Sequence, residues 1–204
     1  MADLPSVVFD VGNVLIRWNP WLVYRDMAIT DAEISAFFED IDFPAWNLEQ
    51  DRGRSWADGV AEAIARCPRH ATLIEKFHRD WQMAVPGAIE GSVLLLERLG
   101  RAGVPLYAIT NFSTEKWMEC QERFPFLSNG FLDIIVSAHE GVVKPDPAIF
   151  GRFLERSGVA AGECVFIDDS PANVRAARSL GMDALLFTDP KHLEDDLRAR
   201  GLAL

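Results

Sequence analysis

The residues best suited to chemistry in this sequence stand where short apolar segments end. A run of β-branched and aromatic residues, which predicts a buried strand, ends on the carboxylate of Asp10, and Gly12 and Asn13 then supply a turn. Two later apolar segments end on a threonine and on a pair of adjacent carboxylates. Each of these groups alone could simply cap a helix. The set that could act together consists of Asp10, Thr110, Lys144, Asp168 and Asp169.

Brought together, these groups could carry out phosphoryl transfer. The carboxylate of Asp10 could attack a phosphoryl group in line and form an acyl phosphate. With Asp168 and Asp169 it would also offer hard oxygen ligands to Mg²⁺, an ion that neutralises charge in the transition state. The hydroxyl of Thr110 and the ammonium of Lys144, in a loop before a predicted helix, could then hold the phosphoryl oxygens.

The elements that must position these groups alternate between strands and helices. This alternation is typical of βαβ units, so we predict an α/β fold: a Rossmann-like parallel sheet with helices on both faces. Ligands bind at the carboxyl ends of the strands in such sheets, and the reactive groups are expected at that edge. After the strand that ends at Asp10, the predicted strands are 104–109, 131–136, 163–167 and 184–187, and the predicted helices are 91–99, 115–123, 148–156, 172–180 and 193–200.

A long segment between the first two strands has the periodicity of helices and no convincing strand. It contains helix starts, among them a Thr30–Glu33 capping box and Ser55 before an apolar-periodic run. The segment is too long for an ordinary crossover between strands. We therefore expect residues 17–86 to form an inserted all-helical cap subdomain over the carboxyl edge of the sheet. Residues 1–16 and 87–204 would form the α/β core domain.

Four segments resemble the four motifs of the haloacid dehalogenase-like (HAD) hydrolase superfamily, in that superfamily's order and across nearly the whole chain. The helical insertion is similar to the small helical cap of that superfamily. The first motif resembles that of its sugar-phosphate phosphatases, a group that includes an α-D-glucose-1-phosphate phosphatase. The four segments are 9–15 (Phe-Asp-Val-Gly-Asn-Val-Leu), 109–111 (Ile-Thr-Asn), 143–150 (Val-Lys-Pro-Asp-Pro-Ala-Ile-Phe) and 166–173 (Phe-Ile-Asp-Asp-Ser-Pro-Ala-Asn).

The resemblance implies a role for each of these groups. Asp10 would be the nucleophile of a Mg²⁺-dependent phosphoric monoester hydrolase that forms a phosphoaspartate, and the substrate would be a small phosphorylated metabolite such as a sugar phosphate. Thr110 and Lys144 would bind the phosphate. The implied metal ligands are Asp10, Asp168, Asp169 and the backbone carbonyl of Gly12.

One position departs from the superfamily's common pattern. Most of its phosphatases carry a second Asp two residues after the nucleophile, as general acid and base, and here that residue is Gly12. Loss of such a group costs about 10²–10⁴-fold in rate, so Gly12 favours substrates with good leaving groups such as glycosyl or acyl phosphates. A second acid could instead come from the cap, where a polar loop holds Asp51, Arg52 and Arg54. The side chains favoured as substrate or phosphate contacts are Trp18, Trp46 and Asn111.

Two other functions remain open from the sequence. A metal-independent 2-haloacid dehalogenase would use the same Asp10 to displace halide from carbon. Gly12 fits that enzyme only weakly, and a metal-free site has no use for Asp168 and Asp169 beside the nucleophile. The other alternative is a catalytically weak phosphate-binding protein that kept the pocket after losing its general acid.

Composition narrows the classes of partner. The 204 residues carry a net charge of −11, which argues against nucleic acid or an anionic membrane surface, although a bound divalent cation would still admit an anionic substrate. Cys67, Cys120 and Cys164 have no CxxC spacing, so neither a disulfide framework nor a zinc site is predicted. No signal peptide is recognisable, and we expect a cytoplasmic protein of open oligomeric state.

Overall fold

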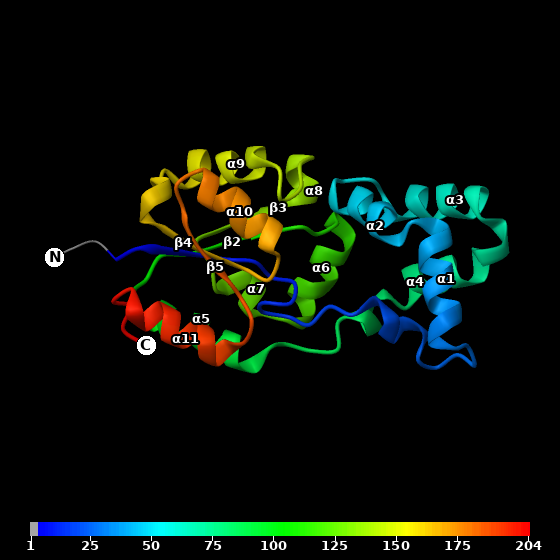
Figure 1. The fold of residues 1–204 in the computed structure, drawn as a ribbon, viewed down its shortest axis with the longest axis horizontal. Helices are drawn as coiled ribbons and strands as arrows, with labels where there is room; N and C mark the ends of the chain where they lie inside the picture. Colours follow the sequence, from blue (N-terminus) through cyan, green and yellow to red (C-terminus); the bar gives the residue numbers. More distant parts are fainter. Residues whose placement is uncertain (1–3) are drawn as a thin grey trace.

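The computed structural model describes residues 4–204, which fold around a five-stranded, entirely parallel sheet (Figure 1). The α/β fold class and all five strands predicted from the sequence are confirmed. Two strands begin two residues later than predicted, one at Leu106, where the preceding Pro105 has no N–H to donate to the ladder, and one at Asp133. The strands, in the order β3-β2-β1-β4-β5 across the sheet, are β1 (Ser6–Phe9), β2 (Leu106–Thr110), β3 (Asp133–Val136), β4 (Cys164–Asp168) and β5 (Asp183–Leu186).

Helices cover both faces of this sheet (Figure 1). Successive residues of a strand point to opposite faces, so Val7 and Phe9 of β1 join one apolar cluster and Val8 joins the other. Both faces of β1 are buried, which is why Val7, Val8 and Phe9 are all apolar. Helices α5 (Glu90–Arg101) and α11 (Pro190–Ala199) contribute to the cluster of Val7, and α9 (Pro147–Ser157) and α10 (Pro171–Ser179) contribute to that of Val8.

Residues 17–86 are helical, as predicted, and their helices lie together beyond one end of the sheet (Figure 1). The Thr30–Glu33 capping box is present: the Glu33 N–H donates to Thr30 Oγ1 over 3.2 Å, and the Thr30 N–H donates to Glu33 Oε2 over 2.7 Å. The helices are η1 (Pro20–Tyr24), α1 (Asp31–Ile41), α2 (Phe43–Asp51), α3 (Trp56–Arg66), η2 (Pro68–His70), α4 (Ala71–Arg79) and η3 (Trp81–Ala84).

The remaining helices lie between the strands of the sheet in sequence. The predicted helix at 115–123 is α6 (Thr114–Arg123). Three short helices were not predicted, because three or four residues are too few to show a helical repeat. They are α7 (Phe126–Asn129), α8 (Ser137–Glu140) and η4 (Ala161–Glu163).

Two general features of residues 4–204 bear on the expectations from composition. None of the helices described there has both the length and the apolar character needed to cross a membrane. Cys67, Cys120 and Cys164 are free thiols and are buried, as expected for small apolar side chains.

Candidate active site

The carboxyl ends of three adjacent strands bring the predicted reactive groups to one edge of the sheet. Asp10 directly follows β1, Thr110 ends β2, and Asp168 ends β4 with Asp169 next to it. One carboxylate oxygen from each of Asp10, Asp168 and Asp169 lies within 4.8 Å of the others. The edge of the sheet therefore assembles a cluster of three carboxyl groups.

Lys144 lies between two of these carboxyl groups. Its Nζ is 2.8 Å from Asp10 Oδ1 and 2.7 Å from Asp168 Oδ2, and its side chain is 1% exposed. Burial alone would lower the pKa of Lys144, but the two neighbouring carboxylates outweigh that effect and raise it. The lysine therefore stays charged, and the fold places it beside Asp168, 24 residues later in the chain.

Burial and neighbouring charges also change the pKa values of the carboxyl groups. Three carboxyl groups face one ammonium here, so full ionisation would leave two uncompensated negative charges. Burial raises the pKa of Asp10 to about 8, although Lys144 acts in the opposite direction. Burial and the neighbouring Asp168 also raise the pKa of Asp169. A divalent cation bound among these oxygens would supply the missing positive charge.

Hydrogen bonds fix the orientation of the two buried carboxylates. Asp168 accepts from Asn173 Nδ2 at both oxygens, over 2.9 and 3.0 Å, and from the Ser170 N–H over 2.8 Å. Asp10 Oδ1 accepts from the Val11 N–H over 2.6 Å. Asn173 and Ser170 lie at the start of α10, so the carboxylate at the end of β4 is held by the helix that follows it.

Thr110 has an unpaired hydroxyl at the same edge. Its Oγ1 is buried, and no group in residues 4–204 forms a hydrogen bond with it. An unpaired buried polar group costs about 1–3 kcal/mol. A phosphoryl oxygen bound beside Asp10 would offer this hydroxyl an acceptor, which fits the role implied by the resemblance.

Asn111 follows Thr110 and contacts the backbone of Lys144 rather than another side chain. Its Nδ2 donates to the Lys144 carbonyl over 3.0 Å, and the Lys144 N–H donates to its Oδ1 over 2.8 Å. The sequence favoured Asn111 as a phosphate contact. The structure places it at the edge of the cavity described next, with its amide engaged in holding the loop of Lys144.

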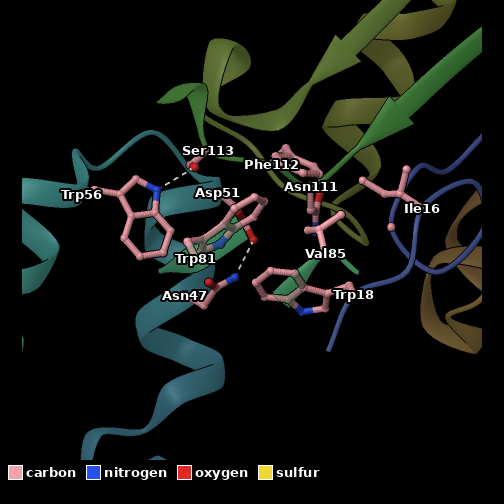
Figure 2. A pocket seen from close by; sticks show the side chains of 11 residues that line it. Ile16, Trp18, Asn47, Asp51, Trp56, Trp81, Val85, Asn111, Phe112 and Ser113 are labelled. Atoms are coloured by element: carbon pink, nitrogen blue, oxygen red, sulfur yellow. Dashed lines mark hydrogen bonds between the residues drawn. The ribbon is translucent and has the colours of Figure 1, made fainter. Parts of the chain in front are cut away.

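A cavity lies between this edge of the sheet and the helical segment (Figure 2). Tryptophan, phenylalanine and aliphatic side chains form much of its wall, and asparagine, aspartate and serine side chains add polar groups. The side chains in Figure 2 come from the loop after β1, from α2, α3 and η3, and from the loop after β2. The eleven residues that line the cavity are Gly12, Ile16, Trp18, Asn47, Asp51, Trp56, Trp81, Val85, Asn111, Phe112 and Ser113.

The two tryptophans favoured from the sequence have different positions. Trp18 lines the cavity. Trp46 does not: it is 3% exposed, and its Nε1 donates to the Gly59 carbonyl over 2.7 Å in the interior of the helical segment. Trp56 and Trp81 line the cavity instead. Sequence alone could not rank these tryptophans, because their positions depend on contacts between distant parts of the chain.

Gly12 contributes open space to the cavity. A Cβ atom built on this residue would meet nothing within 4 Å. Gly12 stands where most phosphatases of the superfamily carry their second Asp. No neighbouring side chain fills the space that this Asp would occupy. Asp51, from the end of α2, is the one carboxylate among the eleven described residues that line the cavity.

Comparisons with known proteins agree with this geometry. A family model described as haloacid dehalogenase-like hydrolase matches residues 5–181. A sesquiterpene phosphatase of Aspergillus oryzae is 29% identical over 191 residues, which are 90% of this chain and 90% of that protein. Flavin mononucleotide hydrolase 1 of Arabidopsis thaliana is 32% identical over 200 residues, covering 98% of this chain and 78% of that protein.

A solved structure shows the same fold. A HAD family enzyme of Bacteroides thetaiotaomicron, in complex with magnesium and inorganic phosphate, superposes with a TM-score of 0.73 at 21% identity, covering 93% of this chain and 98% of that one. The family model spans most of the sequence, and the fold and the Arabidopsis relative agree with it. The chain therefore belongs to the haloacid dehalogenase-like hydrolase family and is a hydrolase.

Proposed function

We propose that this protein is a Mg²⁺-dependent phosphatase that hydrolyses a small phosphorylated metabolite through a phosphoaspartate on Asp10. The observation that carries the proposal is the buried ammonium of Lys144, within 2.8 Å of Asp10 and 2.7 Å of Asp168, beside a third carboxyl group from Asp169. This arrangement combines a nucleophile, a cation for the phosphate and an oxygen-rich site for a metal ion.

The three carboxyl groups fit a magnesium ion. Their oxygens lie within 4.8 Å of one another, and Mg²⁺ prefers hard oxygen ligands. Asp10, Asp168 and Asp169 would hold the ion, and the Gly12 carbonyl remains the further ligand implied by the resemblance. When bound, Mg²⁺ would neutralise charge on the phosphoryl group and on the carboxylates.

The protein's own groups account for the transfer step. A carboxylate oxygen of Asp10 attacks phosphorus, and the bond from phosphorus to the ester oxygen breaks. Thr110 donates its free hydroxyl to a phosphoryl oxygen, and Lys144 shifts part of its interaction from the carboxylates to the incoming phosphate. Water then attacks the phosphoaspartate, releasing phosphate and restoring Asp10.

The composition of the cavity wall favours a substrate whose alcohol part is largely apolar or aromatic. Trp18, Trp56, Trp81 and Phe112 give that part flat apolar surfaces, and Asp51 and the asparagines give it a few polar contacts. Two relatives are named for esters of this kind, a sesquiterpene phosphate and flavin mononucleotide. A sugar phosphate, the expectation from the first motif, stays in the test panel as a comparison.

We also propose that residues 17–86 act as a cap that selects the substrate, with residues 1–16 and 87–204 as the catalytic core. Support comes from the cavity, which is lined partly by the helical segment through Asn47, Asp51 and Trp56. The proposed core contributes Gly12 and Ser113 to the same cavity. Substitution of Trp56, an apolar side chain of the cap that lines the cavity, would then alter substrate preference more than the chemistry of phosphate release.

The test is release of inorganic phosphate from a panel of esters by the intact protein. The panel comprises 4-nitrophenyl phosphate, flavin mononucleotide, a prenyl phosphate and glucose 1-phosphate, each assayed with Mg²⁺ and with EDTA. We expect Mg²⁺-dependent release that is lost in Asp10→Asn and kept in Glu49→Gln, an exposed carboxylate of α2. Absence of phosphate release from every ester would overturn the proposal, and chloride release from a 2-chloro acid would indicate the dehalogenase.

A further inference from the structure

Asp51 and Gly12 line the same cavity. Gly12 belongs to the loop after β1 that carries Asp10, and Asp51 is the last residue of α2. Figure 2 shows the carboxyl group of Asp51 in the middle of the cavity, near the rings of Trp81 and Trp18. Gly12 supplies no carboxylate to this cavity, whereas Asp51 supplies one.

Contacts with the core hold Asp51 in place. Ser137 Oγ, just after β3, donates to the Asp51 carbonyl. Gly53, two residues later, has φ +111°, and a Cβ there would lie 3.0 Å from the Ala138 carbonyl oxygen. The Trp56 Nε1 donates to Ser113 Oγ over 2.7 Å. The turn between α2 and α3 is thus tied to the core at Asp51 and again at Trp56.

The surroundings of the Asp51 carboxyl group suit a group that exchanges a proton. Asn47 Nδ2 donates to Oδ2 over 3.1 Å, and the Ser113 N–H also hydrogen bonds to the carboxylate. Burial nevertheless raises the pKa of Asp51 to about 7. A carboxyl group of this kind can give up and regain a proton near neutral pH.

The two arginines of the same loop are engaged elsewhere. Arg54 donates to Gln50 Oε1 over 2.7 Å, to the Trp46 carbonyl over 2.9 Å, and to Glu62. Arg52 is exposed and pairs with Glu49 over 3.4 Å. Neither lines the cavity. Of the three polar residues that the sequence offered as a second acid, the structure brings only Asp51 to the site.

We infer that Asp51 is the general acid and base of the reaction, an inference that rests on the proposed phosphatase function. As Asp10 attacks phosphorus, the bond from phosphorus to the ester oxygen breaks and that oxygen takes the proton of Asp51, leaving as the alcohol. The Asp51 carboxylate then takes a proton from the water that attacks phosphorus. The bond from phosphorus to Asp10 breaks, phosphate leaves, and both aspartates return to their starting forms.

The experiment compares two esters of similar shape that differ in their need for a proton. The 4-nitrophenolate ion leaves without protonation, whereas the alkoxide of 4-nitrobenzyl phosphate requires it. Alcohol release is measured in a single turnover with enzyme in excess and Mg²⁺ present. For Asp51→Asn we expect release to slow about 10²–10⁴-fold with 4-nitrobenzyl phosphate and less than about tenfold with 4-nitrophenyl phosphate.

A second readout follows the base role. With 4-nitrophenyl phosphate in excess, Asp51→Asn should show a burst of 4-nitrophenol and an accumulated phosphoenzyme, because the attack of water is slowed. Glu49→Gln removes one carboxylate from the same helix outside the cavity and should behave as the wild type. Circular dichroism checks that both variants are folded.

The outcomes separate this inference from the proposed function. Equal slowing of both esters, or no slowing of either, in a folded Asp51→Asn variant would overturn the role of Asp51 while the wild type remains a phosphatase. A wild type that releases no phosphate from either ester, and is indistinguishable from Asp10→Asn, would overturn the proposed function itself and this inference with it.

Discussion

Asn111 and Lys144 are joined by a reciprocal pair of hydrogen bonds, one in each direction. The Asn111 amide donates to the Lys144 carbonyl over 3.0 Å, and the Lys144 N–H donates to the amide oxygen over 2.8 Å. The residue after the end of β2 thereby fixes the backbone of the loop that carries the buried lysine. The ammonium, at the far end of that side chain, meets Asp10 and Asp168.

Asn111→Ala should weaken both stability and activity. The loss of two hydrogen bonds, each contributing about 1 kcal/mol, should lower the free energy of unfolding by about 2 kcal/mol, measured in urea. A displaced lysine should also reduce kcat/KM for 4-nitrophenyl phosphate about 10–100-fold. Asn129→Ala, an exposed asparagine at the end of α7, is the control. Wild-type kcat/KM in Asn111→Ala would contradict this positioning role.

Thr110→Val should separate activity from stability. The hydroxyl is buried without a partner among residues 4–204, so its replacement by a methyl group of similar size should leave the thermal midpoint unchanged or higher. Phosphate release should fall at least about tenfold, since one donor to the phosphoryl oxygens is lost. Thr110→Ser keeps the donor and should retain most activity. Equal activity of the valine and serine variants would argue against a phosphate contact.

The positions of the reactive groups along the sheet could be predicted because they depend on local pattern. Asp10, Thr110 and Asp168 each end a short apolar segment, and parallel strands bring such ends to one edge. Lys144 lies in a loop that has no periodicity, so the sequence placed it by its position directly before a predicted helix and by the resemblance to the HAD motifs. The predicted elements were accurate where an apolar repeat ran over several turns or a whole strand.

The lining of the cavity could not be predicted in the same way. Trp56 and Ser113 are joined by a hydrogen bond although 57 residues separate them, and no local pattern indicates such a contact. Trp46 and Trp56 are both apolar helix residues in sequence, yet one packs inside the helical segment and the other lines the cavity. The lining of the cavity depends on how the helical segment of residues 17–86 packs against the rest of the chain.

Mg²⁺ should stabilise the folded protein through Asp169. A ligand that binds only the folded state at 100 times its Kd adds about 2.7 kcal/mol to the free energy of unfolding. We expect a rise in the thermal midpoint with Mg²⁺ that is largely lost in Asp169→Asn. Glu163→Gln, an exposed carboxylate just before β4, should keep the full rise. An unchanged response in Asp169→Asn would remove this residue from the metal site.

Two of the three thiols should resist modification in the native protein. Burial raises the pKa of Cys120 to about 12 and that of Cys164 to about 11, so neither forms the reactive thiolate at pH 8. A Cys67→Ser variant should therefore react very slowly with a disulfide reagent until denaturant is added, and then release two equivalents. Rapid reaction without denaturant would show that one of these buried sites opens.

Gly12→Asp should compensate for the loss of Asp51. A Cβ at Gly12 meets nothing within 4 Å, so the larger side chain can enter the cavity without displacing a neighbour. The new carboxyl group would stand two residues after the nucleophile and face the same cavity as Asp51. In an Asp51→Asn background, Gly12→Asp should restore much of the activity on 4-nitrobenzyl phosphate, whereas Gly12→Asn should not. Failure of the aspartate to do better than the asparagine would mean that proton transfer at this site depends on more than a carboxyl group in the cavity.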